Sequence, residues 1–396
     1  MVRTDIRPNR SAYDQHAKKQ YSISKEEKMA KITRTSALSA RHIDLGAKLE
    51  EYIRMGVPMR YATDPRDEHD AVREVAGLYD LTAFLKYRVK GPEAVDVLNH
   101  AVTFDVTKIK PGQSKYGPFL RDNGTICDDG IIFNLGNDEY MVCHGDGCAM
   151  KMAEESAQGK DAIVEYDGYT HLISLQGPKA HEFLDNFTPI DLPAMRYFNH
   201  QVTELFDIPC MISRTGFSGE RGYEITTGPE HIVEIWDNIL KYGREIGIMP
   251  CSLSSIFPLR MEAGLLWRRF DLMENTPWEV NMGWVVDRQK EDFRGKEALF
   301  AAEGKERFRL CGVEVDLDRA LAGGEKLLIN GDEVGRVHDK PAYSHRMNKS
   351  LALVRLKPEV AVEGTRLEVE GEEGMSCTAT VVKFPVYDQS KSRTHE

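Results

Sequence analysis

The chain has 396 residues, of which 41% are hydrophobic, and a formal net charge of -11. The composition is that of an ordinary globular protein, and the length predicts two or three domains. The acidic balance argues against nucleic acid as the main partner, because phosphate binding requires a basic surface. No apolar stretch is long enough to span a membrane and no signal-peptide core follows Met1, so we expect a cytoplasmic protein without a membrane partner.

The cysteines are an odd number, seven, and are scattered along the chain without a CxxC pair. Cys143 and Cys148 stand five positions apart, which matches no common zinc spacing. We therefore expect no metal site, and buried, reduced thiols of the kind found in cytosolic proteins.

Residues 1–45 are polar and mostly basic, and we expect a flexible arm or a strap across a neighbouring subunit of a homo-oligomer. Apolar spacing then predicts helices over about 43–54, 67–77 and 92–102, the first ended by Gly56 and Pro58.

From about residue 131 short apolar runs alternate with turn residues and helices. Residues 131–135 and 139–143 predict a hairpin, residues 172–176 precede a helix over 180–187, and residues 210–215 and 223–227 flank a glycine-rich link. A helix is predicted over 231–247. This order favours an α+β region over 46–302 rather than a doubly wound sheet.

The last part of the chain, residues 303–396, contains short strand-like runs separated by Gly, Asp and Pro. That spacing predicts a small all-β barrel or sandwich from about residue 305, after a charged linker over 303–307.

Asp128 and Asp129 form a pair of adjacent carboxylates at the entrance to a predicted strand. Their mutual repulsion beside an apolar run could give one of them a raised pKa suited to acid–base chemistry. A solvated turn would have the same sequence. The spacing alone leaves both interpretations open.

Glu224 lies inside an apolar strand, on the face opposite to Tyr223 and Ile225. Its carboxylate could accept two parallel N–H bonds from a 2-aminopyrimidinone such as a pterin, and the glycines around Phe217 could let a flat ring approach the backbone. An exposed Glu in a hairpin is the alternative.

Further candidates lie in an aromatic and basic stretch over 260–284 and at two single positions. Arg268 and Arg269 could bind a carboxylate, with Trp267 and Trp284 as walls of an apolar slot, although such aromatic residues often belong to a core. Tyr116 and His144 could contact a ligand or be structural. No GxSxG, P-loop, HExxH or dinucleotide fingerprint is present.

Seven motifs in order resemble the glycine cleavage T-protein (aminomethyltransferase) family over about 50–385: DEHDAVREVAGLYDLT, YGPFLRDNGTICDDGIIF, LQGPKA, TGFSGERGYEI, LRMEAGLL, TPWEVNMGWVV and DFRGKEAL. The resemblance implies a three-lobed ring of two ferredoxin-like lobes and a C-terminal β-barrel, with tetrahydrofolate in the central channel.

The resemblance also implies roles for individual positions. Asp128 matches a carboxylate beside the reactive end of the folate, and Glu224 matches the residue that holds the pterin edge. Three further positions match aromatic contacts of the cofactor: Tyr116, Phe217 and Trp284.

Three departures from the family pattern lie near the expected channel, and one is WRRFD at 267–271 in place of the family's LYGND. The family's folate-contacting Arg falls at Ile256, and its strand-end Asn is His144. These departures argue against glycine-cleavage activity and favour a related tetrahydrofolate-dependent demethylase. The run DGIIF at 129–133 also resembles the aromatic O-demethylases among these relatives.

We therefore expect an enzyme that moves a methyl group from a small methylated substrate, such as a methoxybenzoate, to N5 of tetrahydrofolate. Asp128 and His144 are the expected catalytic residues, and Trp267, Arg268 and Arg269 the expected substrate contacts. The alternatives are an aminomethyltransferase, a non-catalytic folate-binding protein, and a subunit of a flavin-linked demethylating dehydrogenase whose flavin lies in a partner chain.

Overall fold

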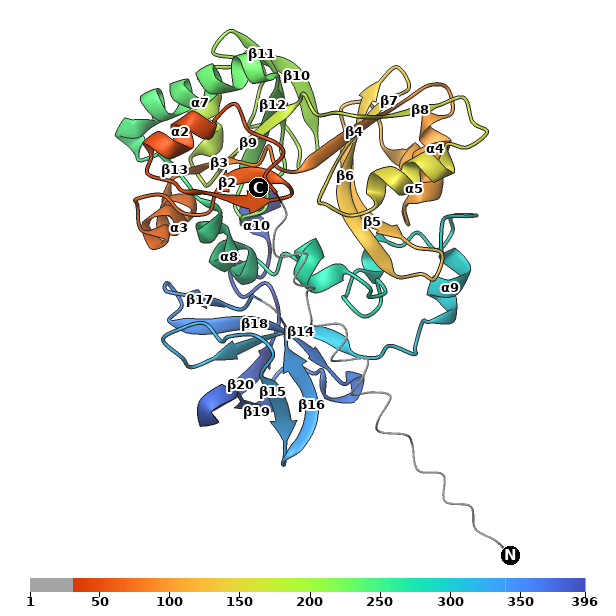
Figure 1. Ribbon diagram of the computed structural model, residues 1–396, viewed down its shortest axis with the longest axis vertical. Coiled ribbons are helices and arrows are strands. Elements are labelled where there is room, and N and C mark those ends of the chain that lie inside the picture. Colours follow the sequence, from red (N-terminus) through yellow and green to blue (C-terminus); the bar gives the residue numbers. More distant parts are fainter. Residues whose placement is uncertain (1–30, 339, 396) are drawn as a thin grey trace, which may run out of the picture.

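The computed structural model describes residues 31–338 and 340–395. Figure 1 shows three lobes around a central junction: two of mixed α and β structure, and a β-barrel formed by the C-terminal part of the chain. The α+β class and the three-lobed arrangement expected from the sequence are confirmed.

The first lobe is built on a six-stranded sheet with the order β10-β11-β12-β9-β3-β13. Its strands are β3 (Gly77–Asp80), β9 (His171–Gln176), β10 (His200–Leu205), β11 (Ile208–Ser213), β12 (Gly222–Thr227) and β13 (Met249–Pro250). Helices α6 (Ala180–Leu184) and α7 (Pro229–Gly243) pack on this sheet, and α3 (Pro65–Glu74) lies beside β3. Alternate residues of β12, Tyr223 and Ile225, are fully buried in this core, which directs the residue between them to the other face.

The second lobe is built on a five-stranded sheet with the order β5-β6-β7-β4-β8. Its strands are β4 (Leu85–Lys90), β5 (Ser114–Leu120), β6 (Ile126–Gly136), β7 (Glu139–His144) and β8 (Ile163–Tyr166), covered by α4 (Ala94–Ala101) and α5 (Ala149–Ser156). The predicted hairpin is confirmed: β6 and β7 pair antiparallel, with Asn137 and Asp138 at positive φ in the turn.

The third lobe is a closed barrel. Its strands are β14 (Arg309–Val315), β15 (Lys326–Ile329), β16 (Asp332–Val337), β17 (Ala342–Ser344), β18 (Lys349–Leu356), β19 (Arg366–Glu370) and β20 (Ser376–Val382). β14 pairs with both β20 and β18, which closes the sheet, while β17 adds to β18 outside the ring. Closure leaves few open strand edges.

The helix predicted over 43–54 is wrong. The structure has α2 (Ser39–Asp44), followed by a hairpin of β1 (Leu49–Tyr52) and β2 (Met55–Pro58). Ile53 and Arg54 form its two-residue turn with φ of 50° and 59°. A turn with positive φ at both positions normally uses Gly or Asn, so these two residues gave no turn signal in the sequence.

The predicted N-terminal arm lies mostly outside the described residues, but its last part is folded. Leu38 is fully buried, and the buried His42 bonds the Asp80 carboxylate through Nε2 at 2.9 Å. The packed domain therefore begins before residue 45. None of the helices in the described ranges is long and apolar enough to cross a membrane.

A buried ion pair joins helix α8 (Leu253–Glu262) to the short π-helix η4 (Arg268–Leu272) that follows it in the chain. Arg260, in α8, donates from Nη1 to Oδ2 of Asp271 at 2.7 Å, and both side chains are fully buried. Asp271 belongs to η4 and also accepts from the backbone N–H of Trp267. The pair thus fixes the segment that carries the predicted substrate residues.

We expect Asp271→Ala to lower the free energy of unfolding by about 3–5 kcal/mol, because it leaves the Arg260 charge buried without its carboxylate. Chemical denaturation would measure the loss. The control is Asp237→Ala, which removes the exposed pair with Arg41 and should cost about 0–1 kcal/mol. Equal losses in both variants would contradict this account.

Candidate active site

A cavity of about 980 Å³ lies where the lobes meet. It is lined by residues of β6, β7 and β12, of the segments 214–217 and 264–269, and of the barrel and the C-terminal segment. Among the candidate residues named from the sequence, nine line it: Tyr116, Asp129, His144, Phe217, Glu224, Trp267, Arg268, Arg269 and Trp284. Asp128 does not.

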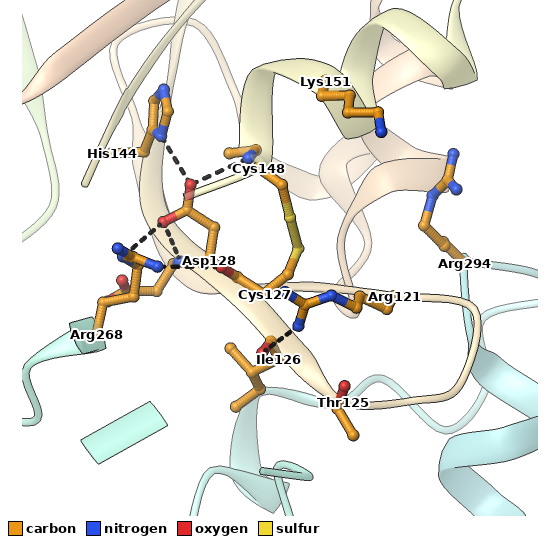
Figure 2. The surroundings of a disulfide bond; sticks show 12 residues. Arg121, Thr125, Ile126, Cys127, Asp128, His144, Cys148, Lys151, Arg268 and Arg294 are labelled. Atoms are coloured by element: carbon orange, nitrogen blue, oxygen red, sulfur yellow. Dashed lines mark hydrogen bonds and ion pairs between the residues drawn. A yellow bond between two sulfur atoms is a disulfide. The ribbon is translucent and has the colours of Figure 1, made fainter. Parts of the chain in front are cut away.

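Asp128 is fully buried and does not line the cavity. Figure 2 shows its carboxylate among the groups that bond it. Its Oδ2 lies 2.8 Å from Nδ1 of His144 and accepts the backbone N–H of Ala149 at 3.0 Å. Its Oδ1 accepts the N–H of Asp129 at 3.0 Å and lies 3.5 Å from Nε of Arg268. With these partners, the carboxylate is held in place and cannot reach a ligand without giving up hydrogen bonds.

The approach of Asp128 to the start of α5 requires a glycine. A Cβ atom at Gly147 would lie 2.3 Å from Cγ of Asp128, so any other residue would push the carboxylate away. The loop between β7 and α5 is therefore shaped around this side chain.

Asp129 is the carboxylate of the pair that lines the cavity. Its Oδ2 accepts a hydrogen bond from the Tyr116 hydroxyl at 2.7 Å. Burial, followed by the charge of Asp128, raises the pKa of Asp129 to about 7. The expectation that one of the two carboxyls has a raised pKa is confirmed for Asp129, which can exchange a proton near neutral pH.

His144 ends β7 and lines the cavity beside Asp129. Its Nδ1 faces Asp128, and its ring packs edge-on against Tyr87 at 5.4 Å. Because the Asp128 carboxylate can only accept, Nδ1 of His144 carries the proton of this hydrogen bond. In the neutral ring Nε2 then has a free lone pair for another partner. The Asp128–His144 pair thus has the orientation of a supported acid–base residue.

Glu224 lines the cavity from the first lobe, on β12. Among the described residues, the only hydrogen bond to the Glu224 carboxylate comes from the Thr215 hydroxyl, and burial raises the pKa of this carboxyl. A carboxylate with one neutral partner keeps lone pairs for N–H donors of a ligand.

Two glycines of the 216–222 link, which line the cavity, also make room for a buried side chain. A Cβ at Gly216 or Gly222 would meet the buried Gln176 side chain at 2.0 or 2.4 Å. They make room for this amide, which donates to the Thr215 carbonyl and so supports the residue bonded to Glu224.

An aromatic wall surrounds Trp267. Its ring stacks on Phe257 at a centroid distance of 5.1 Å, and meets Tyr52 and Phe217 edge-on at 6.0 Å each. Tyr52 was not expected in the site, because it belongs to the hairpin that sequence patterning assigned to a helix.

The two predicted arginines have different surroundings. Arg268 is buried and paired with Asp146, besides its proximity to Asp128, so its charge is largely compensated. Arg269 is exposed at the cavity edge. Trp284 also lies at the edge, with 73% of its surface exposed.

The expectation of reduced thiols is wrong for two of the seven cysteines. Cys127 in β6 and Cys148 before α5 form a disulfide, with their Cα atoms 6.0 Å apart. Cys127 directly precedes Asp128 (Figure 2), and Cys148 directly precedes Ala149, whose N–H bonds the Asp128 carboxylate. Only the tertiary packing of α5 on β6 brings the two cysteines together. The other five cysteines are free thiols.

Comparisons with known proteins agree with this geometry. Residues 38–290 match the model of the GCVT N-terminal domain, and residues 309–388 match that of the glycine cleavage T-protein C-terminal barrel domain. The chain is 39% identical to the heme-dependent oxidative N-demethylase gamma subunit of Ectopseudomonas mendocina (strain ymp), over 92% of this chain and 99% of the relative.

It is also 33% identical to an aminomethyltransferase of Streptomyces coelicolor, over 90% of this chain and 98% of the relative. The crystal structure of the glycine cleavage system aminomethyltransferase T from Bartonella henselae superposes with a TM-score of 0.83 at 25% identity. It covers 90% of this chain and 98% of that one.

The raised pKa of Asp129 predicts a pH-dependent stability. Between about pH 4 and about pH 7 the folded chain holds a proton on Asp129 that the unfolded chain releases, so this residue's contribution to stability falls as the pH rises through that window. We expect the unfolding free energy of the wild type to fall relative to Asp129→Asn between about pH 4 and about pH 7. Urea denaturation across this range would test it, and parallel curves would contradict the assignment.

Proposed function

Because the chain belongs to the glycine cleavage T-protein family, whose enzymes carry out folate-dependent one-carbon transfer, we propose that it transfers a carbon at the oxidation level of formaldehyde to tetrahydrofolate. We further propose that this carbon comes from an N-methyl group oxidised by a partner subunit. The name of one full-length relative, an oxidative N-demethylase subunit, supports this assignment.

The observation that carries the proposal is that Asp129 and Glu224, from different lobes, line one cavity. Glu224 is suited to hold the pterin, whose 2-amino group and ring N–H are parallel donors. Bound tetrahydrofolate supplies two nucleophilic nitrogens, N5 and N10, that together can take up the carbon of formaldehyde with loss of one water.

Asp129 would move the protons of this condensation. The carbonyl oxygen must gain two protons to leave as water, and the two nitrogens lose them, so an acid–base group with a pKa of about 7 suits both transfers. Nε2 of His144, oriented by Asp128, is an acceptor in the neutral ring and would take a hydrogen bond from the hydroxyl group that leaves. In this scheme Asp128, expected from the sequence to touch the folate, acts through His144.

The lining of the cavity bears on the one-carbon donor. Aromatic rings around Trp267 together with the carboxylates of Asp129 and Glu224 favour a cationic methylated amine or its oxidised form. The same aromatic wall would also suit the aromatic methyl ether expected from the sequence. The two donors differ in product, because direct methyl transfer gives 5-methyltetrahydrofolate.

The decisive experiment identifies the folate product and its rate. At micromolar formaldehyde, stopped-flow measurement should show 5,10-methylenetetrahydrofolate forming faster than in the uncatalysed reaction. Asp129→Asn should lower the catalysed rate by about 10²–10⁴-fold. The proposal fails if the rate equals the uncatalysed one.

A parallel anaerobic panel tests the alternative donor. The chain would be incubated with tetrahydrofolate and methoxybenzoates, methylated amines or betaines, and the products separated by chromatography. We expect no 5-methyltetrahydrofolate. Its appearance with one substrate would replace the present proposal by direct demethylation and would name the methyl donor.

A further inference from the structure

We propose that His69, Asp70 and His345 form a binding site for a divalent transition metal, with zinc as the best match. His69 and Asp70 lie on α3, and His345 directly follows β17 of the barrel. None of the three lines the cavity, so the site is separate from the proposed one-carbon chemistry. Figure 1 shows α3 above and β17 below the level of α8, where the first lobe meets the barrel, and both elements contact α8.

The donor atoms already have nearly the separations that a metal requires. His345 Nε2 lies 2.8 Å and His69 Nδ1 lies 3.5 Å from Oδ1 of Asp70, and the ligand atoms of the group all lie within 4.8 Å of one another. Zinc–nitrogen and zinc–oxygen bonds of about 2.0–2.2 Å in a tetrahedron place neighbouring donors roughly 3.3–3.5 Å apart. Small side-chain movements would therefore admit the ion.

A carboxylate orients the buried histidine for this role. Nε2 of His69 lies 3.0 Å from both carboxylate oxygens of Glu262, which also accepts from Arg73 and Ser344. The imidazole N–H therefore points to Glu262, and in the neutral ring Nδ1 presents a lone pair to the Asp70 carboxylate. The lone pair of His69 Nδ1 and the Asp70 carboxylate thus face each other, and Glu262 accepts from the other ring nitrogen of His69. This arrangement is typical of metal ligation.

Arg346 is the group that opposes a cation here. Its Nη1 donates to Asp70 Oδ1 at 2.9 Å, but also to Glu74 Oε1 at 2.8 Å. When a metal takes Asp70, Arg346 can keep Glu74 as its partner. The side chains of Asp70 and His345 are 40% and 20% exposed, which leaves room for water as the remaining ligand.

A metal at this site would tie α3 to the barrel and stabilise the folded chain by binding. No metal was expected from the sequence, because no cysteine spacing matches a zinc site. His345 lies 275 positions from Asp70, so no local spacing connects these ligands. The inference does not depend on the one-carbon chemistry.

The test is metal binding to the full chain after removal of metals with a chelator. Calorimetric titration with Zn²⁺ should show one equivalent bound, and Co²⁺ should give the visible absorption of a site with nitrogen ligands. His345→Ala and Asp70→Asn should each weaken Zn²⁺ binding at least about tenfold. Circular dichroism would establish that both variants fold.

The matched control is His231→Ala, which removes a partly exposed histidine of α7 and should leave Zn²⁺ affinity unchanged. Absence of saturable binding to the wild type would overturn the proposal. So would equal affinity in the wild type and His345→Ala, since the ion would then bind elsewhere.

Discussion

The arrangement of the site depends on one buried carboxylate, that of Asp128. A buried charge is stable only when hydrogen bonds and ion pairs replace its hydration. The partners of Asp128 are a histidine side chain, two backbone N–H groups and a nearby guanidinium. These donors belong to β6, β7, the start of α5 and the π-helix η4. Satisfying Asp128 therefore fixes the position of each of these elements around the cavity.

The adjacent carboxylates acquire different properties from their surroundings. Asp128 is fully bonded and does not line the cavity, whereas Asp129 has one phenol as side-chain partner, faces the cavity and has a pKa of about 7. Neighbouring titratable groups with such different surroundings are common in active sites. The pair divides into a residue that orients and a residue that can exchange protons.

Much of the fold could be predicted from the sequence, because strand alternation and turn residues are local. The β6–β7 hairpin and the barrel strands follow from them. The hairpin around Ile53 and Arg54 could not, since neither residue signals a turn. For the site, Glu224 was recognisable because its neighbours Tyr223 and Ile225 are apolar. The different environments of Asp128 and Asp129, and the Cys127–Cys148 pairing, depend on the packing of α5, which no local pattern encodes.

The proposed chemistry depends on Glu224 holding folate in the cavity between the lobes, and equilibrium binding of tetrahydrofolate measures this contact. Hydrogen bonds to a charged group contribute about 1.5–3 kcal/mol, so Glu224→Gln should raise the Kd about tenfold to a hundredfold. Glu230→Gln, an exposed residue of the same lobe whose side chain does not line the cavity, should bind like the wild type. Unchanged affinity in Glu224→Gln would contradict the account and place the folate elsewhere.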